Sequence, residues 1–202
     1  MGKKGDLTRQ KLIKAAKKLF HSQGYTNTSI GEVCRLSGVN RGNLYFHFQN
    51  KQELAIAVLE HALATGVPFL ENLMSPEPDP LRRLELMLNG IISLHVNREG
   101  KGGCLFGNFA LEMGDNNREI SAGSARFFEV WRELIAGLLQ EAKAKGRLRP
   151  DFECQETAQL IMCTIEGALV ICKASKDTGQ LQRTGDTLIK LILDQQIPAS
   201  VN

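Results

Sequence analysis

Apolar residues recur every three to four positions along most of the chain, and this period predicts amphipathic helices. The first stripe consists of Leu12, Ile13, Ala16, Leu19 and Phe20. Gly24 follows it, where a left-handed helix cap is expected. Stripes of the same period continue towards the C-terminus, and no pair of strand patterns lies between them. The pattern predicts an all-α fold of about nine helices, with a three-helix N-terminal head followed by a helical body.

Residues 29–48 have the pattern of two short helices joined by a tight turn. Ser29 and Glu32 have the spacing of a capping box, which marks a helix start. Gly38 accepts a positive φ angle in the turn, and Asn40 is a suitable N-cap for the next helix. Two short helices around a turn with glycine form a helix-turn-helix unit, whose second helix enters the major groove of DNA.

The second helix of this unit carries side chains that suit DNA on the face away from its core. Leu44 and Phe48 lie one turn apart and are expected to face inward. Arginine reads guanine and asparagine reads adenine, whereas tyrosine, histidine and lysine bind phosphates. The rings of Tyr45, Phe46 and His47 can instead be packing residues, and Lys51 can instead be a solvated charge. Because the inward stripe is already filled, DNA contact is favoured for Tyr45, whereas Phe46 stays open. The candidates are Arg41, Gly42, Asn43, Tyr45, Phe46, His47 and Lys51.

Charge is divided unevenly along the 202 residues, although the net charge is only +3. Residues 1–51 hold ten Lys and Arg against two Asp and Glu, a net charge of +8. Residues 52–202 hold fifteen against twenty, a net charge of −5. A basic head on an acidic body indicates a polyanionic partner such as DNA. A solvated basic helix face is the alternative explanation.

The chain also resembles a known family over residues 8–54, the head of the TetR family of bacterial repressors. The motifs that carry the resemblance are Thr28-Ser29, Gly38-Val39-Asn40-Arg41-Gly42-Asn43-Leu44-Tyr45-Phe46-His47-Phe48 and Lys51-Gln52-Glu53-Leu54. The family usually has serine in place of Asn40 and Ile-Ala in place of Val33-Cys34, and both changes keep the cap and the packing. By position, the resemblance implies DNA contacts at Thr28, Ser29, Asn40, Arg41, Gly42, Asn43, Tyr45, Phe46, His47 and Lys51.

The resemblance further implies the organisation and the function of the chain. Residues 1–54 would bind operator DNA, and residues 55–202 would bind a ligand and form a homodimer. Such a regulator represses transcription from a palindromic operator and is released by a small molecule or an electrophile. A DNA-binding helical protein with no ligand response stays open as an alternative.

An all-helical enzyme is a further alternative, but neither G-x-S-x-G nor a phosphate-binding loop motif occurs in the sequence. No cofactor is expected. No run of 18 apolar residues predicts a membrane span, and no apolar signal region follows the charged N-terminus. These features predict a cytoplasmic protein.

Residues 155–174 form a predicted helix that is apolar on nearly all sides. A helix of this kind must bury all of its faces, which predicts contact with a second copy of the chain. Together with residues 184–196 it is expected to form a four-helix bundle across a two-fold axis. The predicted interface consists of Ile161, Ile165, Ala168, Leu169, Leu188, Leu191 and Ile192.

An apolar set in the middle of the chain is the candidate for a ligand pocket, although the same residues can simply form core. Its members are Met87, Ile91, His95, Cys104, Phe106, Phe109, Met113, Phe127 and Trp131. Cys104 starts a predicted helix close to Arg98 and Lys101, where a thiolate is favoured. Residues 103–112 also resemble the segment of a subgroup that includes the electrophile-sensing repressor of N-ethylmaleimide reductase. A small buried apolar residue is the alternative for Cys104.

The other cysteines give no metal pattern. The five cysteines contain no C-x-x-C pair, as expected for a reduced chain. Cys154, Cys163 and Cys172 are nine residues apart, so neighbours face opposite ways on a helix. We therefore expect no metal site.

Overall fold

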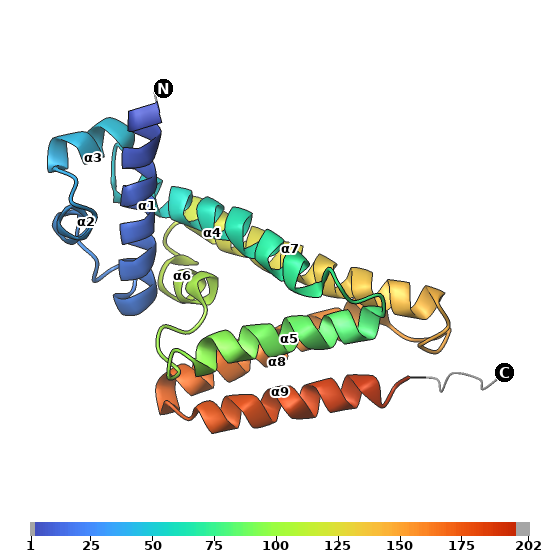
Figure 1. The fold of residues 1–202 in the computed structure, drawn as a ribbon. Helices are drawn as coiled ribbons and strands as arrows, with labels where there is room; N and C mark the ends of the chain where they lie inside the picture. The colour runs from blue at the N-terminus through green and yellow to red at the C-terminus, as the bar shows by residue number, and fades with distance from the viewer. Residues whose placement is uncertain (1–2, 197–202) are drawn as a thin grey trace. The chain divides into compact units, whose positions relative to one another are not determined.

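A computed structural model describes residues 3–196, and over that range it confirms the all-α prediction with nine helices (Figure 1). An isolated bridge between Leu148 and Gln196 is the only extended pairing in this range. The helices are α1 (Lys3–Gln23), α2 (Ile30–Ser37), α3 (Arg41–His47), α4 (Lys51–Met74), α5 (Pro80–Val96), α6 (Leu105–Met113), α7 (Arg118–Ala144), α8 (Cys154–Ser175) and α9 (Thr178–Leu193).

The helices form two compact units. Within the described residues, the first unit comprises residues 3–66 and 104–127, and the second comprises residues 67–103 and 128–196. Helix α6 and the first part of α7 thus belong to the same compact unit as the predicted head. The boundary after residue 54, which separates the predicted DNA-binding part from the predicted ligand-binding part, concerns function and not packing. It stays a prediction.

The first unit is built from the local signals that the sequence carries. Helix α1 ends before Gly24, whose φ angle is +87°. The capping box of Ser29 and Glu32 is present at the start of α2. Gly38 has a φ angle of +68° and forms the left-handed cap of α2, as predicted. The buried core of this unit includes Leu12, Ile13, Ala16, Phe20, Val33, Leu44, Phe48, Leu54, Val58 and Phe109.

The second unit packs α5 and α8 against α9, which lies beside both helices. Gly185 on α9 allows α5 to approach closely, because a Cβ atom there would lie 2.0 Å from Cδ1 of Ile92. Ile92 is fully buried, so it has little room to move. The buried core of this unit includes Leu81, Leu84, Met87, Leu88, Ile92, Ile161, Ile165, Leu169 and Leu181.

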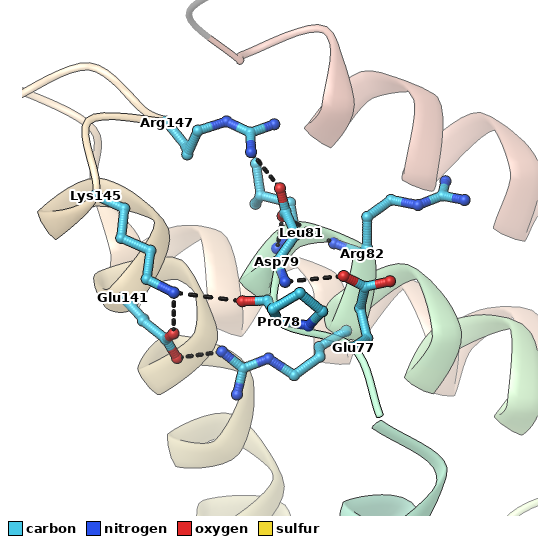
Figure 2. A network of polar contacts seen from close by, with 9 residues as sticks. Glu77, Pro78, Asp79, Leu81, Arg82, Glu141, Lys145 and Arg147 are labelled. Atoms are coloured by element: carbon cyan, nitrogen blue, oxygen red, sulfur yellow. Dashed lines mark hydrogen bonds and ion pairs between the residues drawn. The ribbon is translucent and has the colours of Figure 1, made fainter. Parts of the chain in front are cut away.

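A polar network fixes the proline-rich link before α5 to the end of α7, as Figure 2 shows. Asp79 caps α5 by accepting the N–H groups of Leu81 and Arg82, and it pairs with Arg147. Burial opposes ionisation of Asp79, but these donors outweigh it, so the pKa of Asp79 is lowered. Lys145 donates to the carbonyl oxygen of Pro78 at 3.3 Å. Side chains from the end of α7 and the turn after it therefore anchor the link between α4 and α5, beside its own backbone hydrogen bond from Glu77 to Met74.

Helices α4 and α8 are long and apolar enough, by length and composition alone, to cross a membrane. The criterion of eighteen uninterrupted apolar residues missed both, because polar residues interrupt each helix. In α8 the side chains of Ile161, Ile165 and Leu169 are buried within the protein. Core helices pass the same test, so these two helices do not indicate a membrane protein.

Two helical glycines, one at the close approach of α5 and α9 and one in open space on α7, are expected to respond in opposite ways to alanine. Gly185→Ala should lower the free energy of unfolding by about 1–3 kcal/mol, because the added methyl group overpacks the core against Ile92. Gly137→Ala, where no atom lies within 4 Å of the added Cβ, should raise it by about 0.5–1 kcal/mol through helix propensity. Urea unfolding measures both. Equal stabilisation by the two substitutions would contradict the packing of α9 on α5.

Candidate nucleic-acid interface

Helix α3 has one face fixed inward and its N-terminus capped. Leu44 and Phe48 are fully buried, as the sequence predicted. The side chain of Asn40 accepts the N–H group of Asn43 at 2.8 Å, which starts the helix. With the left-handed turn at Gly38 before it, α2 and α3 form the predicted helix-turn-helix arrangement.

The opposite face of α3 is open to solvent. Arg41, Gly42 and Asn43 are all exposed. Tyr45 is 43% exposed and Phe46 is 79% exposed, so neither ring belongs to the core. The guanidinium group of Arg41 donates to the Tyr45 hydroxyl at 3.4 Å and lies 5.7 Å from the centre of its ring. The tyrosine therefore holds the arginine at the surface.

His47 and Lys51 are both held by neighbouring rings. His47 is half-buried, its ring is edge-on to Phe46 at 5.2 Å, and its buried Nδ1 has no hydrogen-bond partner among the described residues. The Nζ atom of Lys51 donates to the carbonyl oxygen of Thr26 at 3.3 Å and lies 4.2 Å from the ring centre of Tyr25. Burial lowers the pKa of Lys51, although nearby carboxylates oppose this shift. Lys51 is thus a positioned cation and not a freely solvated charge.

The two residues proposed at the start of α2 differ in accessibility. Thr28 is only 1% exposed, and its hydroxyl donates to the carbonyl oxygen of Gly24 at 2.7 Å. Its side chain therefore shapes the loop, and the DNA contact expected at Thr28 stays a prediction. Ser29 is exposed, and its hydroxyl accepts the N–H group of Glu32 at 3.2 Å. Hydrogen bonds from the backbone and hydroxyl of Ser29 lower the pKa of Glu32.

The sequence did not single out Glu112, which attaches α6 to the loop between α1 and α2. Its carboxylate accepts the N–H groups of Tyr25 at 3.3 Å and of Thr26 at 2.9 Å. A Cβ atom at Gly24 would lie 2.4 Å from its Oε1 atom, so this contact needs glycine there. The ring of Tyr25 also packs on Phe109 of α6 at 5.8 Å. These partners are more than 80 residues apart, so no local pattern reveals them.

The nine pocket candidates fall into both compact units. Met87, Ile91, His95 and Trp131 belong to the second unit, and Cys104, Phe106, Phe109, Met113 and Phe127 belong to the first. In the first unit, Phe106 stacks on Phe127 with ring centres 3.8 Å apart. Phe109 packs edge-on to Phe20, so it forms part of the core beneath α1.

His95 has the surroundings of a hydrogen-bonded core histidine. Its Nδ1 and Nε2 atoms lie 2.8 Å and 3.3 Å from the carbonyl oxygens of Ile91 and Gly103. Burial lowers the pKa of His95, although both carbonyl contacts oppose that shift. These contacts match the packing alternative for His95 and leave a ligand role as a prediction.

Cys104 is the N-cap of α6, as the sequence predicted for a helix start at this place. It is half-buried, and its Sγ atom accepts the N–H group of Gly107 at 3.4 Å. Cys163 is the exposed cysteine, whereas burial raises the pKa of both Cys154 and Cys172. Among residues 3–196, no three His, Cys, Asp or Glu side chains are grouped so that they could hold a metal ion.

Helices α8 and α9 expose several apolar side chains in the single chain. Of the seven residues proposed for the dimer interface, Leu191 is exposed and the other six are buried within the chain itself. Exposed apolar side chains next to them are Leu160 at 62% and Ile171 at 51%. A hollow of about 470 Å³ between the two helices is lined by Leu160, Thr164, Gln180, Arg183, Thr184, Thr187, Leu188 and Leu191.

Comparison with known proteins finds related chains along nearly the whole length. Family models described as "Bacterial regulatory proteins, tetR family" and "Tetracyclin repressor-like, C-terminal domain" match residues 12–58 and 80–188. The transcriptional repressor DhaR of Mycobacterium sp. strain GP1 is 24% identical over 96% of this chain and 94% of its own. A TetR transcriptional regulator of Chloroflexus aurantiacus is 26% identical, with a TM-score of 0.88 over 96% of this chain and 98% of that chain. Reduced Escherichia coli NemR shares the fold at 20% identity, with a TM-score of 0.81 over 96% of this chain and 99% of that chain.

Proposed function

The chain belongs to the TetR family of bacterial transcriptional regulators, and we propose that it represses transcription as a homodimer on a palindromic operator. A small molecule or electrophile that acts on residues 55–202 releases it from DNA. The observation that carries this proposal is the open face of α3, which presents Arg41 and Asn43 on a basic head. Because the operator is part of bacterial DNA, this function predicts a cytoplasmic protein.

Each exposed group of the head has a distinct part in DNA binding. Arg41 and Asn43 suit the base edges of the major groove, where they pair with guanine and adenine. Tyr45 holds Arg41 in place, and Gly42 lets the helix backbone come close. Ser29 and His47 meet phosphates at the edges of the groove, and Lys51 adds a positioned charge. The side chain of Thr28 supports the loop from inside.

The exposed face of α8 and α9 suits a second copy of the chain. Along α8 the stripe Leu160, Thr164, Gly167 and Ile171 alternates spacings of four and three, and Gln180, Thr184, Thr187 and Leu191 do the same along α9. This spacing is typical of helices that pack in a bundle. Two such faces related by a two-fold axis form a four-helix bundle. The buried neighbours, such as Ile165 and Leu169, support this face from within the chain.

Helix α6 provides a path from an effector to the DNA-binding surface. Cys104 caps one end of this helix, and Glu112 near its other end holds the N–H groups of Tyr25 and Thr26. The loop that contains Tyr25 and Thr26 leads directly into α2. An effector that shifts α6 therefore changes the position of the helix-turn-helix unit, and the two states differ in affinity for DNA.

The open face of α3 predicts how two substitutions differ in their effect on DNA. Arg41→Ala should weaken the best operator by about 1–3 kcal/mol and relax base preference at one position. Lys51→Ala should weaken all sequences alike and reduce the salt slope by about 1. Fluorescence anisotropy at several salt concentrations measures both. If Arg41→Ala left affinity and base preference unchanged, the placement of α3 in the groove would be wrong.

The face of α8 and α9 predicts that Leu160→Glu yields a folded monomer. Leu160 is exposed in the single chain, so the charge is tolerated there but not inside a dimer interface. Leu86→Glu on α5, where the leucine is 39% exposed, is the matched control and should stay dimeric. Sedimentation velocity measures the mass, and alkylation of Cys163 should be slow in the wild type and fast in Leu160→Glu. A monomeric wild type at micromolar concentration would refute the dimer.

The position of Cys104 predicts a response to electrophiles. Brief treatment with N-ethylmaleimide should label Cys104 before the other four cysteines and should release operator DNA, because a thiolate is favoured at a helix N-terminus. Cys104→Ser keeps an N-cap oxygen, so it should bind DNA but lose the response. Peptide mapping and anisotropy measure the two effects. Slow labelling would make Cys104 a packing residue, and fast labelling without release would point to a non-covalent effector.

A further inference from the structure

Phe46 is the most exposed large apolar side chain among the described residues, at 79%. It lies on the side of α3 opposite the buried pair Leu44 and Phe48. A single exposed aromatic is ordinary on a protein surface, but this one lies on the same short helix as the exposed Arg41 and Asn43. Its surroundings indicate what covers it on DNA.

Gly42 adds no side chain to the face of α3 that carries Phe46. Residues four apart lie on the same helical face, so Gly42 shares this face with Phe46. A Cβ atom at Gly42 would meet only Asn40 Oδ1, at 3.6 Å. The ring of His47 packs edge-on to that of Phe46, at an interplanar angle of 84°. Phe46 is thus supported by one neighbouring ring and is otherwise largely exposed.

The chemistry of the ring selects its partner in the groove. Phenylalanine carries no hydrogen-bond donor or acceptor, so it cannot pair with the polar base edges or with phosphates. The C5-methyl group of thymine is the apolar feature that the major groove of unmodified DNA presents. Tyr45, one residue earlier, differs because its hydroxyl accepts from Arg41. Phe46 therefore gains most by covering a methyl group.

We propose that Phe46 reads the C5-methyl group of one thymine in each half-site, in the space that Gly42 leaves open. This inference rests on the proposed function, because it assumes that α3 lies in the major groove of an operator. It assigns thymine to a position next to the bases that Arg41 and Asn43 contact. Specificity at that position comes from burial of a methyl group and not from a hydrogen bond.

Single-atom changes in the DNA test the inference. The operator is first selected from random double-stranded DNA with the wild-type protein. Each thymine of one half-site is then replaced by deoxyuridine, which lacks only the methyl group, and the Kd is measured by anisotropy at fixed salt. One replacement should weaken wild-type binding about fourfold, the value expected for one buried carbon group.

Two variants separate Phe46 from general effects. Phe46→Ala should bind the thymine and deoxyuridine operators with equal affinity, because the ring that covers the methyl group is gone. Leu111→Ala removes a side chain of similar exposure, 75%, on α6 and should behave like the wild type. Gly42→Ala fits the free protein but narrows the open space, so it should weaken binding to the thymine operator.

The outcomes distinguish this inference from the proposed function. If no deoxyuridine replacement weakens the wild type, or if the loss persists in Phe46→Ala, Phe46 does not read a thymine methyl group. Wild-type affinity in Gly42→Ala would overturn the part assigned to Gly42. If the wild type selects no DNA sequence at all, the proposed function itself fails.

Discussion

The inward packing of Leu44 and Phe48 is the constraint on which the DNA-binding surface depends. These two side chains are buried in the core of the first unit and fix the rotation of α3 about its axis. The cap at Asn40 and the left-handed turn at Gly38 set where that helix begins. Once these positions are fixed, the exposed side chains of the helix are those of Arg41, Asn43, Tyr45 and Phe46. No other rotation of α3 would bury the apolar pair and expose these groups together.

A second constraint joins α6 to the head over a long stretch of sequence. Glu112 takes the place of a local cap by accepting two N–H groups of the loop between α1 and α2. Lys51 and Tyr25 complete the arrangement through a cation over an aromatic ring, with a distance of 4.2 Å to its centre. The loop that supports the DNA-binding helices is thus held by a helix of the predicted effector domain. The proposed effector response would use this connection, which lies within a single compact unit.

Local patterns predicted the elements of the head, whereas long-range contacts decided the roles of several residues. The capping box and the turn glycine are short-range signals, so the sequence was sufficient for α2 and α3. The periodicity of α8 predicted that all of its sides are buried. It could not distinguish the sides that face the chain's own core from those that stay exposed in a single chain. Ile165 faces the core, whereas Leu160 is exposed. The resemblance implied a DNA contact at Thr28, but it gave no sign that the side chain is buried and donates to the carbonyl oxygen of Gly24. Nothing local identified Glu112.

The central claim is that two copies of α3 lie in successive major grooves on one side of a palindromic operator. Hydroxyl-radical footprinting of the wild-type protein on its selected operator measures this arrangement directly. The account predicts two protected patches related by two-fold symmetry and centred about 34–36 Å apart, or a multiple of one turn. A single patch, or protection spread evenly along the DNA with no symmetry, would contradict it.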